Sequence, residues 1–224
     1  MIEISNEQTY GWEETIRGMR NPMNSWDKSD SYECHSTGGC SCERERYNDN
    51  GFCHNINLGT NDLSLMKKLI KAGTDHSKFM RMITVYCDIT APLYWWKEYD
   101  TYKIGTVANS CSTMHKIHAK EFTMDDFSHE GIDDTNILWS IPAELNKWRK
   151  LYIETQNKYY WHQMIKILPT SYNQKRTVQL NYAVLRNMYH SRKNHKLDEW
   201  HTFCEWVETL PYSELITDDM KGGE

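Results

Sequence analysis

Apolar and polar residues recur with two different periods along this chain, and each period predicts a different kind of element. Apolar residues at intervals of three and four predict helices over residues 10–20, 62–73, 93–103, 140–167, 175–192 and 197–209. Residues 80–89 are instead rich in β-branched and aromatic side chains, which predicts a strand that ends at Ala91-Pro92. The pattern therefore predicts an α+β, helix-rich single domain, residues 1–224, around a small, mostly antiparallel sheet.

Two segments carry no clear period and are expected to be loops. Residues 104–116 form one of them, and the polar, cysteine-rich segment 25–58 forms a longer loop or insertion within the domain. Asn61 or Asp62 is expected to cap the helix that follows this insertion. The insertion contains four thiols, Cys34, Cys40, Cys42 and Cys53, enough to bind one zinc ion, but their spacing is not one of the common paired forms. Free thiols and no metal are therefore favoured, and zinc is the alternative.

Charge and composition exclude several function classes. A net charge of −5 argues against a protein that coats nucleic acid, although a few local basic groups are enough to bind a small anionic ligand. No apolar run approaches the ~20 residues that a membrane helix needs, and the first ten residues lack the features of a signal peptide. Seven cysteines, an odd number, fit a reducing compartment. We expect a cytoplasmic protein with no nucleic-acid or membrane partner.

The most informative chemistry lies between residues 168 and 200. If 175–192 is helical, Asn181 and Arg192 are separated by close to three turns and lie near one face, with Asn187 about a third of a turn away. An arginine at a helix end beside side-chain amides suits a planar, hydrogen-bonding ligand such as a pyrimidine or a flavin ring. The alternative is an arginine that caps helix carbonyls next to surface amides.

The spacing of Leu168-Pro169, Asn181, Asn187 and Arg192 resembles the C-terminal half of the flavin-dependent thymidylate synthases. The resemblance implies that the two asparagines contact FAD and that Arg192 contacts and activates the pyrimidine of dUMP. It extends to an acidic-aromatic segment, residues 198–200, that follows the arginine.

The N-terminal half resembles the same family in its layout. Helix 62–73, a turn and a strand that ends in Ala91-Pro92 follow one another as they do in the family. The turn contains a basic cluster, His76, Lys78 and Arg81, and the resemblance places Arg81 and His76 on the flavin side. The alternative is a solvated basic loop.

The family signature RHRxxSxNExSxRY is not conserved in this chain. Thr101-Tyr102-Lys103 stands where the family has its RHR triplet, and Asn109, Cys111 and Ser112 stand in the later part of the motif. Lys166 is the basic residue near Leu168-Pro169, where the family has an arginine. The candidate substrate-binding residues are therefore Lys103, Asn109, Cys111, Ser112 and Lys166. A loop thiol such as Cys111 can act as a nucleophile, but an incidental thiol is the favoured interpretation.

The resemblance also implies an activity. It implies transfer of a one-carbon unit from methylenetetrahydrofolate, through FAD reduced by NAD(P)H, to C5 of dUMP or a related pyrimidine nucleotide. Arg192 is then the catalytic residue that stabilises negative charge developing on the ring. The altered signature leaves a repurposed nucleotide- or flavin-binding protein without synthase activity as the alternative.

The family resemblance further implies a homotetramer. A surplus of aromatic residues is compatible with a large interface, although burial in a core explains it equally well: Trp95, Trp96, Tyr99, Tyr159, Tyr160 and Trp161.

Overall fold

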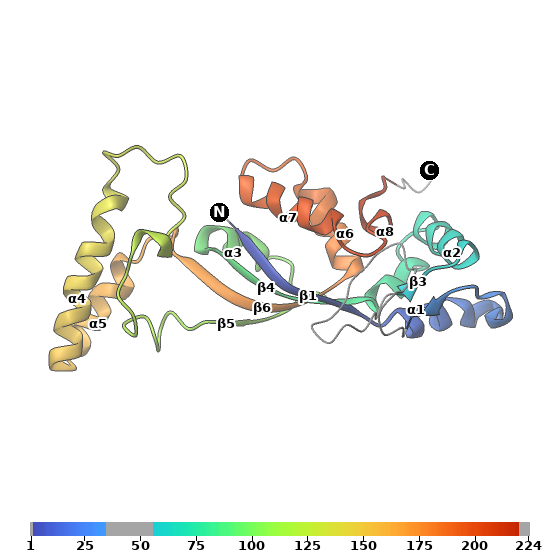
Figure 1. Ribbon diagram of the computed structural model, residues 1–224, viewed down its shortest axis with the longest axis horizontal. Coiled ribbons are helices and arrows are strands. Elements are labelled where there is room, and N and C mark those ends of the chain that lie inside the picture. The colour runs from blue at the N-terminus through green and yellow to red at the C-terminus, as the bar shows by residue number, and fades with distance from the viewer. Residues whose placement is uncertain (1, 35–55, 220–224) are drawn as a thin grey trace. The chain divides into compact units, whose positions relative to one another are not determined.

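The computed structural model describes residues 2–34 and 56–219, and its main sheet has four strands. Their order is β1-β4-β6-β5, formed by β1 (Glu3–Tyr10), β4 (Thr84–Pro92), β6 (Asn173–Asn181) and β5 (Val107–Ser110) (Figure 1). β5 pairs with β6 in antiparallel register, with Asn109 opposite Thr177. A second, two-stranded antiparallel sheet joins β2 (Tyr32–Glu33) to β3 (Ile56–Asn57). The predicted class, a helix-rich α+β fold around a small antiparallel sheet, is confirmed.

Contacts between residues divide the chain into two compact units. The first unit comprises Met1–Glu7, Tyr86–Gln179 and Arg192–Trp206, and the second comprises Gln8–Val85, Leu180–Ser191 and Val207–Glu224. The boundaries fall inside elements: three strands of the main sheet, the helix α6 (Tyr182–Arg192) and the helix α7 (Asp198–Glu208).

An aromatic cluster forms one core of the first unit. Helix α3 (Leu93–Tyr99) contributes Trp95, Trp96 and Tyr99, all at most 2% exposed, and α7 contributes Trp200 and Phe203, both fully buried. The ring centroids of Trp95 and Trp200 lie 4.8 Å apart. Burial in this core therefore explains three of the six aromatic residues that were considered for an interface.

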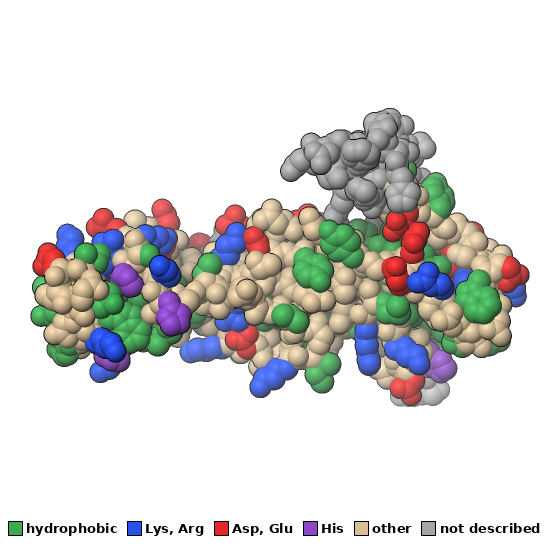
Figure 2. Space-filling view, turned by 90° about the horizontal axis from the view of Figure 1, so that it is seen from below, with side chains coloured by type: hydrophobic (Ala, Val, Ile, Leu, Met, Phe, Trp, Pro, Cys, Tyr) green, Lys and Arg blue, Asp and Glu red, His purple; other side chains and the backbone are tan. Residues whose placement is uncertain are grey.

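A second core of the first unit lies against a pair of helices. Helices α4 (Ile141–Thr155) and α5 (Lys158–Ile167) lie side by side (Figure 1) and enclose a cluster that includes Phe122, Phe127, Leu145 and Met164. Tyr159 on α5 is 57% exposed. Figure 2 shows hydrophobic, basic, acidic and His side chains mixed in the region of these two helices, at the left of the view.

The second unit packs its remaining helices around buried aromatic and aliphatic side chains. These helices are α1 (Trp12–Arg20), α2 (Thr60–Lys71), most of α6 and α8 (Glu214–Thr217), with the 3-10 turns η1 (Asn21–Met23), η2 (Trp26–Lys28) and η3 (Ser77–Arg81). Trp12 packs edge-on against Tyr182, with centroids 5.3 Å apart. Gly11 has φ 87°, and a Cβ there would lie 2.2 Å from the Met82 carbonyl oxygen, so only glycine fits.

Two further 3-10 turns and one isolated bridge belong to the described part of the first unit. The turns are η4 (Met124–Asp126) and η5 (Ile137–Ser140), and Phe127 bridges to Tyr172. In η4, the side chains of Thr123 and Asp126 form a capping box. These short elements fix the long connection between β5 and α4.

Several predicted boundaries are wrong, each for a local reason. Residues 175–192 are not one helix, because β6 ends at Asn181 before α6 begins. The predicted helix 140–167 is two helices, since Gln156 adopts a left-handed conformation with φ 56° that ends α4. The predicted loop 104–116 contains the strand β5.

The helix that follows the cysteine-rich insertion has a different N-cap from the one predicted. Gly59, not Asn61 or Asp62, occupies the N-cap of α2, and Asp62 is fully buried in the first turn.

Three of the four cysteines in the insertion, Cys40, Cys42 and Cys53, lie outside the described residues. Zinc binding by the insertion therefore stays an alternative prediction. Within 2–34 and 56–219, no group of three or more His, Cys, Asp or Glu side chains is arranged to hold a metal ion. None of the helices in these ranges has the length and apolar character needed to cross a bilayer.

Candidate active site

Arg192 is fixed in the first unit by contacts on several sides. Its Nη1 lies 2.5 Å from Oε2 of Glu98 on α3, and its Nε donates a hydrogen bond of 2.8 Å to the Tyr102 hydroxyl. The guanidinium carbon lies 4.9 Å from the centroid of the Trp200 ring and 5.5 Å from that of Tyr102, a cation–π geometry. The Arg192 side chain is 18% exposed. A charged group is thus held in a defined orientation and still reaches solvent.

His195 joins the same cluster from the loop between α6 and α7. Its Nδ1 accepts a hydrogen bond from the Leu197 backbone N–H at 3.2 Å, so Nε2 carries the proton and faces Oε2 of Glu98 at 3.2 Å. Arg192 and His195 thus approach the same oxygen of Glu98. We name Arg192, Glu98, His195 and Tyr102, with Trp200 beneath, the Arg192 cluster.

Sequence reasoning did not select three members of this cluster. Glu98 and His195 were not considered, and Tyr102 was noted only as a replacement within the signature. The available signal for Glu98 was that it is the one acidic residue in the aromatic segment 93–99. A carboxylate in a segment that packs a core needs a partner, and Arg192 is that partner.

A hydrogen bond also links α3 to α7. The Tyr94 hydroxyl on α3 donates to the Glu199 carboxylate on α7. Burial, reinforced by the carboxylate of Glu199, raises the pKa of Tyr94 well above its ordinary value. Tyr94 therefore remains a protonated donor at any physiological pH, and it helps to hold α3 against α7.

The residues that stand in the altered signature lie on or next to the edge strand β5. Asn109 is exposed opposite Thr177 of β6. The Cys111 backbone N–H donates to the Lys175 carbonyl at 2.9 Å, and its thiol is exposed. Ser112 Oγ accepts from the backbone N–H of Met114 and of His115, at 3.2 and 3.0 Å. Ser112 thus stabilises a turn.

Two lysines complete the candidates in the first unit. Lys103 follows the Arg192 cluster residue Tyr102 in the chain and is exposed, and Lys166 is exposed on α5. Neither lysine has a described ion-pair partner in the residues that the structure covers. Both remain available to an anionic ligand, and their role stays a prediction.

The proposed flavin contacts all lie in the second unit. Asn181 ends β6, and its Oδ1 accepts from the Val184 backbone N–H at 2.9 Å, so this side chain caps α6. Asn187 is exposed on α6. His76 precedes η3 and Arg81 ends it, and both side chains are exposed. The candidate residues are thus divided between the two units, and their roles as ligand contacts stay predictions.

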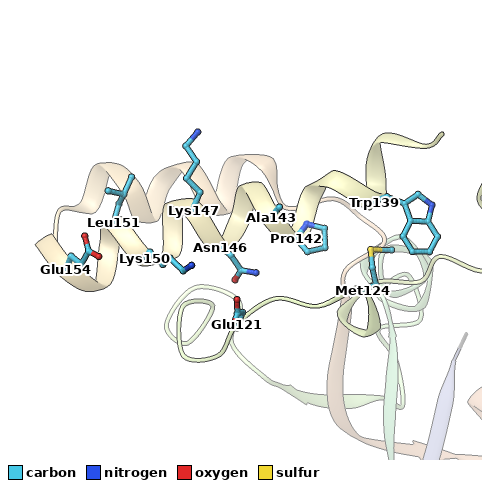
Figure 3. Close-up of a pocket in the computed structure, with 10 residues that line it drawn as sticks. All are labelled: Glu121, Met124, Trp139, Pro142, Ala143, Asn146, Lys147, Lys150, Leu151 and Glu154. Carbon is cyan, nitrogen blue, oxygen red and sulfur yellow. The ribbon is translucent and has the colours of Figure 1, made fainter. Parts of the chain in front are cut away.

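A surface groove lies elsewhere in the first unit, along α4. It has a volume of about 750 Å³ and is lined by side chains of mixed character, including Trp139, Asn146, Lys150 and Glu154 (Figure 3). The Asn146 side chain is bonded to the backbone N–H and carbonyl of Phe122. No candidate residue is among those that line the groove. Its position gives no support to the predicted chemistry, and we base the site on the Arg192 cluster instead.

Comparison with known proteins identifies the fold. No protein-family model matches the chain, and no curated protein matches it. Among solved structures, a crystal structure of thymidylate synthase X from Helicobacter pylori with FAD and dUMP matches with a TM-score of 0.63 and 15% identity over 98% of both chains. A second structure of this bacterium's flavin-dependent thymidylate synthase, complexed with FAD and dUMP, gives a TM-score of 0.58 and 15% identity over 97% of this chain and 98% of that one.

These two matches cover nearly the whole chain, whereas the identity is low. The likeness therefore concerns the path of the backbone, and it agrees with the resemblance predicted from the residue spacing. The chain has the fold of the flavin-dependent thymidylate synthases.

Proposed function

We propose that this chain is a flavin-dependent, thymidylate synthase-like enzyme that transfers a one-carbon unit to C5 of dUMP or a related pyrimidine nucleotide. FAD, methylenetetrahydrofolate and NAD(P)H are its proposed cofactor and co-substrates. The single observation that supports the proposal most is a fold shared over nearly the full length with proteins crystallised with FAD and dUMP. The orientation of Arg192, held at the end of α6 and stacked on Trp200, adds a residue that suits a pyrimidine ring.

The described residues offer suitable chemistry for FAD. A dinucleotide carries an anionic pyrophosphate, and the exposed His76, Lys78 and Arg81 around η3 supply basic donors for it. Asn187 offers an exposed amide to a ring edge. Asn181 fits less well, because its side-chain oxygen already caps α6. When bound, FAD would supply the redox chemistry; the chain's own residues would bind and orient it.

In the proposed reaction, the part of Arg192 is electrostatic. A guanidinium stabilises negative charge that develops on a ring, and it does so more strongly where it is fixed and partly shielded from water. The Trp200 ring and the Tyr102 hydroxyl provide that fixation. Loss of a donor of this type typically lowers kcat by roughly 100-fold to 1,000-fold.

The test is a turnover assay with a matched arginine variant. Protein supplied with FAD, NADPH, methylenetetrahydrofolate and a pyrimidine nucleotide is expected to yield a nucleotide heavier by one methyl or hydroxymethyl group, detected by mass spectrometry. Arg192→Ala is expected to lose turnover and to retain FAD. Arg17→Ala, which changes an exposed arginine on α1, serves as the control and is expected to keep turnover. Absence of product with every pyrimidine nucleotide overturns the proposal.

One observation favours a second candidate, a repurposed nucleotide- or flavin-binding protein. The Glu98 carboxylate already neutralises Arg192, which weakens its ability to stabilise further negative charge. If this candidate is right, nucleotide and flavin bind to the natural protein without any product, and Arg192→Ala changes the affinity for nucleotide alone.

A further inference from the structure

The Arg192 cluster leaves a defined set of donors and acceptors unused. Arg192 and His195 both approach Oε2 of Glu98, and no residue within the described ranges donates to its Oε1. A guanidinium has five N–H groups, and Arg192 uses two of them, one toward Glu98 and one toward Tyr102. The side chains of Glu98 and Arg192 are 34% and 18% exposed. A ligand at this surface therefore meets an acceptor-only carboxylate directly beside a fork of donors.

This order of groups distinguishes the two common pyrimidines. The ring edge of cytosine carries an amino donor at N4 beside two acceptors, N3 and O2. Uracil has an acceptor, O4, where cytosine has the amino group, and an N–H at N3 between its two carbonyls. A carboxylate accepts well from cytosine N4, and an arginine fork donates to a pair of adjacent acceptors. Uracil would instead bring its O4 against the carboxylate, which repels it.

The opposite charges of Glu98 and Arg192 also favour cytosine. Glu98 and Arg192 neutralise each other, so the cluster favours a neutral ring over one that has lost its N3 proton. His195 adds a polar N–H group 3.2 Å from the same carboxylate oxygen, on the side away from a ligand at Oε1. Among neighbouring charges, Lys193 and Lys196 flank His195 in the chain, and Asp198 and Glu199 begin α7. Glu199 is engaged by Tyr94 and does not compete for Arg192.

We propose that Glu98 is a specificity-determining residue and that the Arg192 cluster selects a cytosine nucleotide over a uracil nucleotide. The inference rests on the proposed function, because it assumes that this cluster binds a pyrimidine ring. It names the base: Glu98 accepts from the N4 amino group, and Arg192 donates to N3 and O2. His195 is a positioning residue that acts through Glu98.

The test measures the affinities of dCMP and dUMP by isothermal titration calorimetry on the full chain. The natural protein is expected to bind dCMP at least about tenfold more tightly than dUMP, the discrimination of one well-matched base contact. N4,N4-dimethyl-dCMP lacks the amino hydrogens and is expected to lose this advantage, a comparison that needs no variant.

Two variants then separate the role of Glu98 from a general effect of lost charge. Glu98→Gln is expected to bring the dCMP-to-dUMP ratio to within about threefold of one, because a side-chain amide can turn to donate or accept. Asp100→Asn is the matched control: Asp100 also ends α3 and pairs at 2.7 Å with an arginine, Arg176, that stacks on a tryptophan. This control is expected to keep the full preference.

The outcomes distinguish the two proposals. Equal or tighter binding of dUMP by the natural protein overturns the cytosine preference and leaves the proposed function intact. A preference that survives in Glu98→Gln, or in the dimethylated ligand, also overturns it. If neither nucleotide binds, both proposals fail together.

Discussion

Some residues of the candidate site can be predicted from the sequence, whereas others are identified only by their contacts in the folded chain. Arg192 was selected from its spacing to Asn181 and Asn187, and the structure gives it a fixed orientation. Its partners Glu98 and His195 were not selected, because they are 94 and 3 residues away from it in the chain and no local pattern links them. An ion pair of high sequence separation depends on where the folded chain brings Arg192, the last residue of α6, next to α3. Residue spacing along one helix cannot predict such a pair.

Two cysteines are expected to differ sharply in reactivity. Burial raises the pKa of the Cys87 thiol on β4 to about 12, whereas the Cys111 thiol is exposed beyond β5. Since the thiolate is the nucleophile, brief treatment of the native protein with iodoacetamide should alkylate Cys111 and spare Cys87.

Peptide mass spectrometry checks this expectation, with protein unfolded in urea as the control in which both thiols react. Alkylation of Cys87 at the same rate as Cys111 in the native protein would contradict the burial of β4.

At the scale of elements, prediction succeeded where one period ran without interruption and failed where two elements meet. The segment 175–192 contains a helix and most of the strand β6, whose buried side chains Gln174, Val178 and Leu180 follow a period of two. Its alternation is short and consists partly of polar residues, so the following helical pattern dominated the interpretation. Gln156 ends α4 in a left-handed conformation, which glycine or asparagine normally signals. The strand β5 has four exposed residues, and pairing to β6 rather than burial defines it.

A buried ion pair ties helix α1 to helix α2. Nε of Arg20 lies 2.6 Å from Oδ1 of Asp62, and the two side chains are 4% and 0% exposed. Burial alone raises the pKa of Asp62, but hydrogen bonds from Ser31, Ser29 and Arg20 hold the pKa below its ordinary value. Asp62→Ala leaves the Arg20 charge buried without its partner, so we expect a loss of about 3–5 kcal/mol in the free energy of unfolding.

Urea unfolding followed by circular dichroism measures this loss. Asp75→Ala removes an exposed carboxylate from the same unit and should change the free energy of unfolding by less than about 0.5 kcal/mol. An Asp62 variant as stable as this control would show that the pair does not hold the two helices together.

The carboxylate of Asp88 on β4 should make the stability of the fold depend on pH. Hydrogen bonds from Thr177, Lys175 and Asn6 lower the pKa of Asp88 to about 2. A folded-state pKa below the unfolded value stabilises the fold above that unfolded value, about 4, and this stabilisation is lost as the pH falls toward 2. The natural protein should therefore lose more stability than Asp88→Asn between pH 4 and pH 2.

Urea midpoints at pH 7, 4 and 2.5 give the comparison, and the exposed Asp134→Asn serves as the control. Parallel curves for the natural protein and the Asp88 variant would mean that the carboxylate adds no stability to the β1-β4-β6 ladder.

At the scale of the whole molecule, a shared backbone path coexists with an altered signature. Two flavin-dependent thymidylate synthase structures match 97–98% of the chain at 15% identity. Buried positions account for the fold, since the aromatic core of α3 and α7 and the cluster under α4 and α5 need only apolar volume. Site chemistry depends on individual side chains and changes independently of the fold. The proposed homotetramer stays a prediction, with exposed Tyr159 as one residue available to an interface.

The visible absorption spectrum of the protein, after incubation with FAD and removal of free flavin by gel filtration, tests the central proposal most directly. A flavin-dependent enzyme should retain the absorption bands of oxidised flavin, and these bands should shift when a pyrimidine nucleotide is added, because its binding would change the surroundings of the flavin ring. A colourless protein, with a spectrum unchanged by FAD and by every pyrimidine nucleotide, would contradict the account.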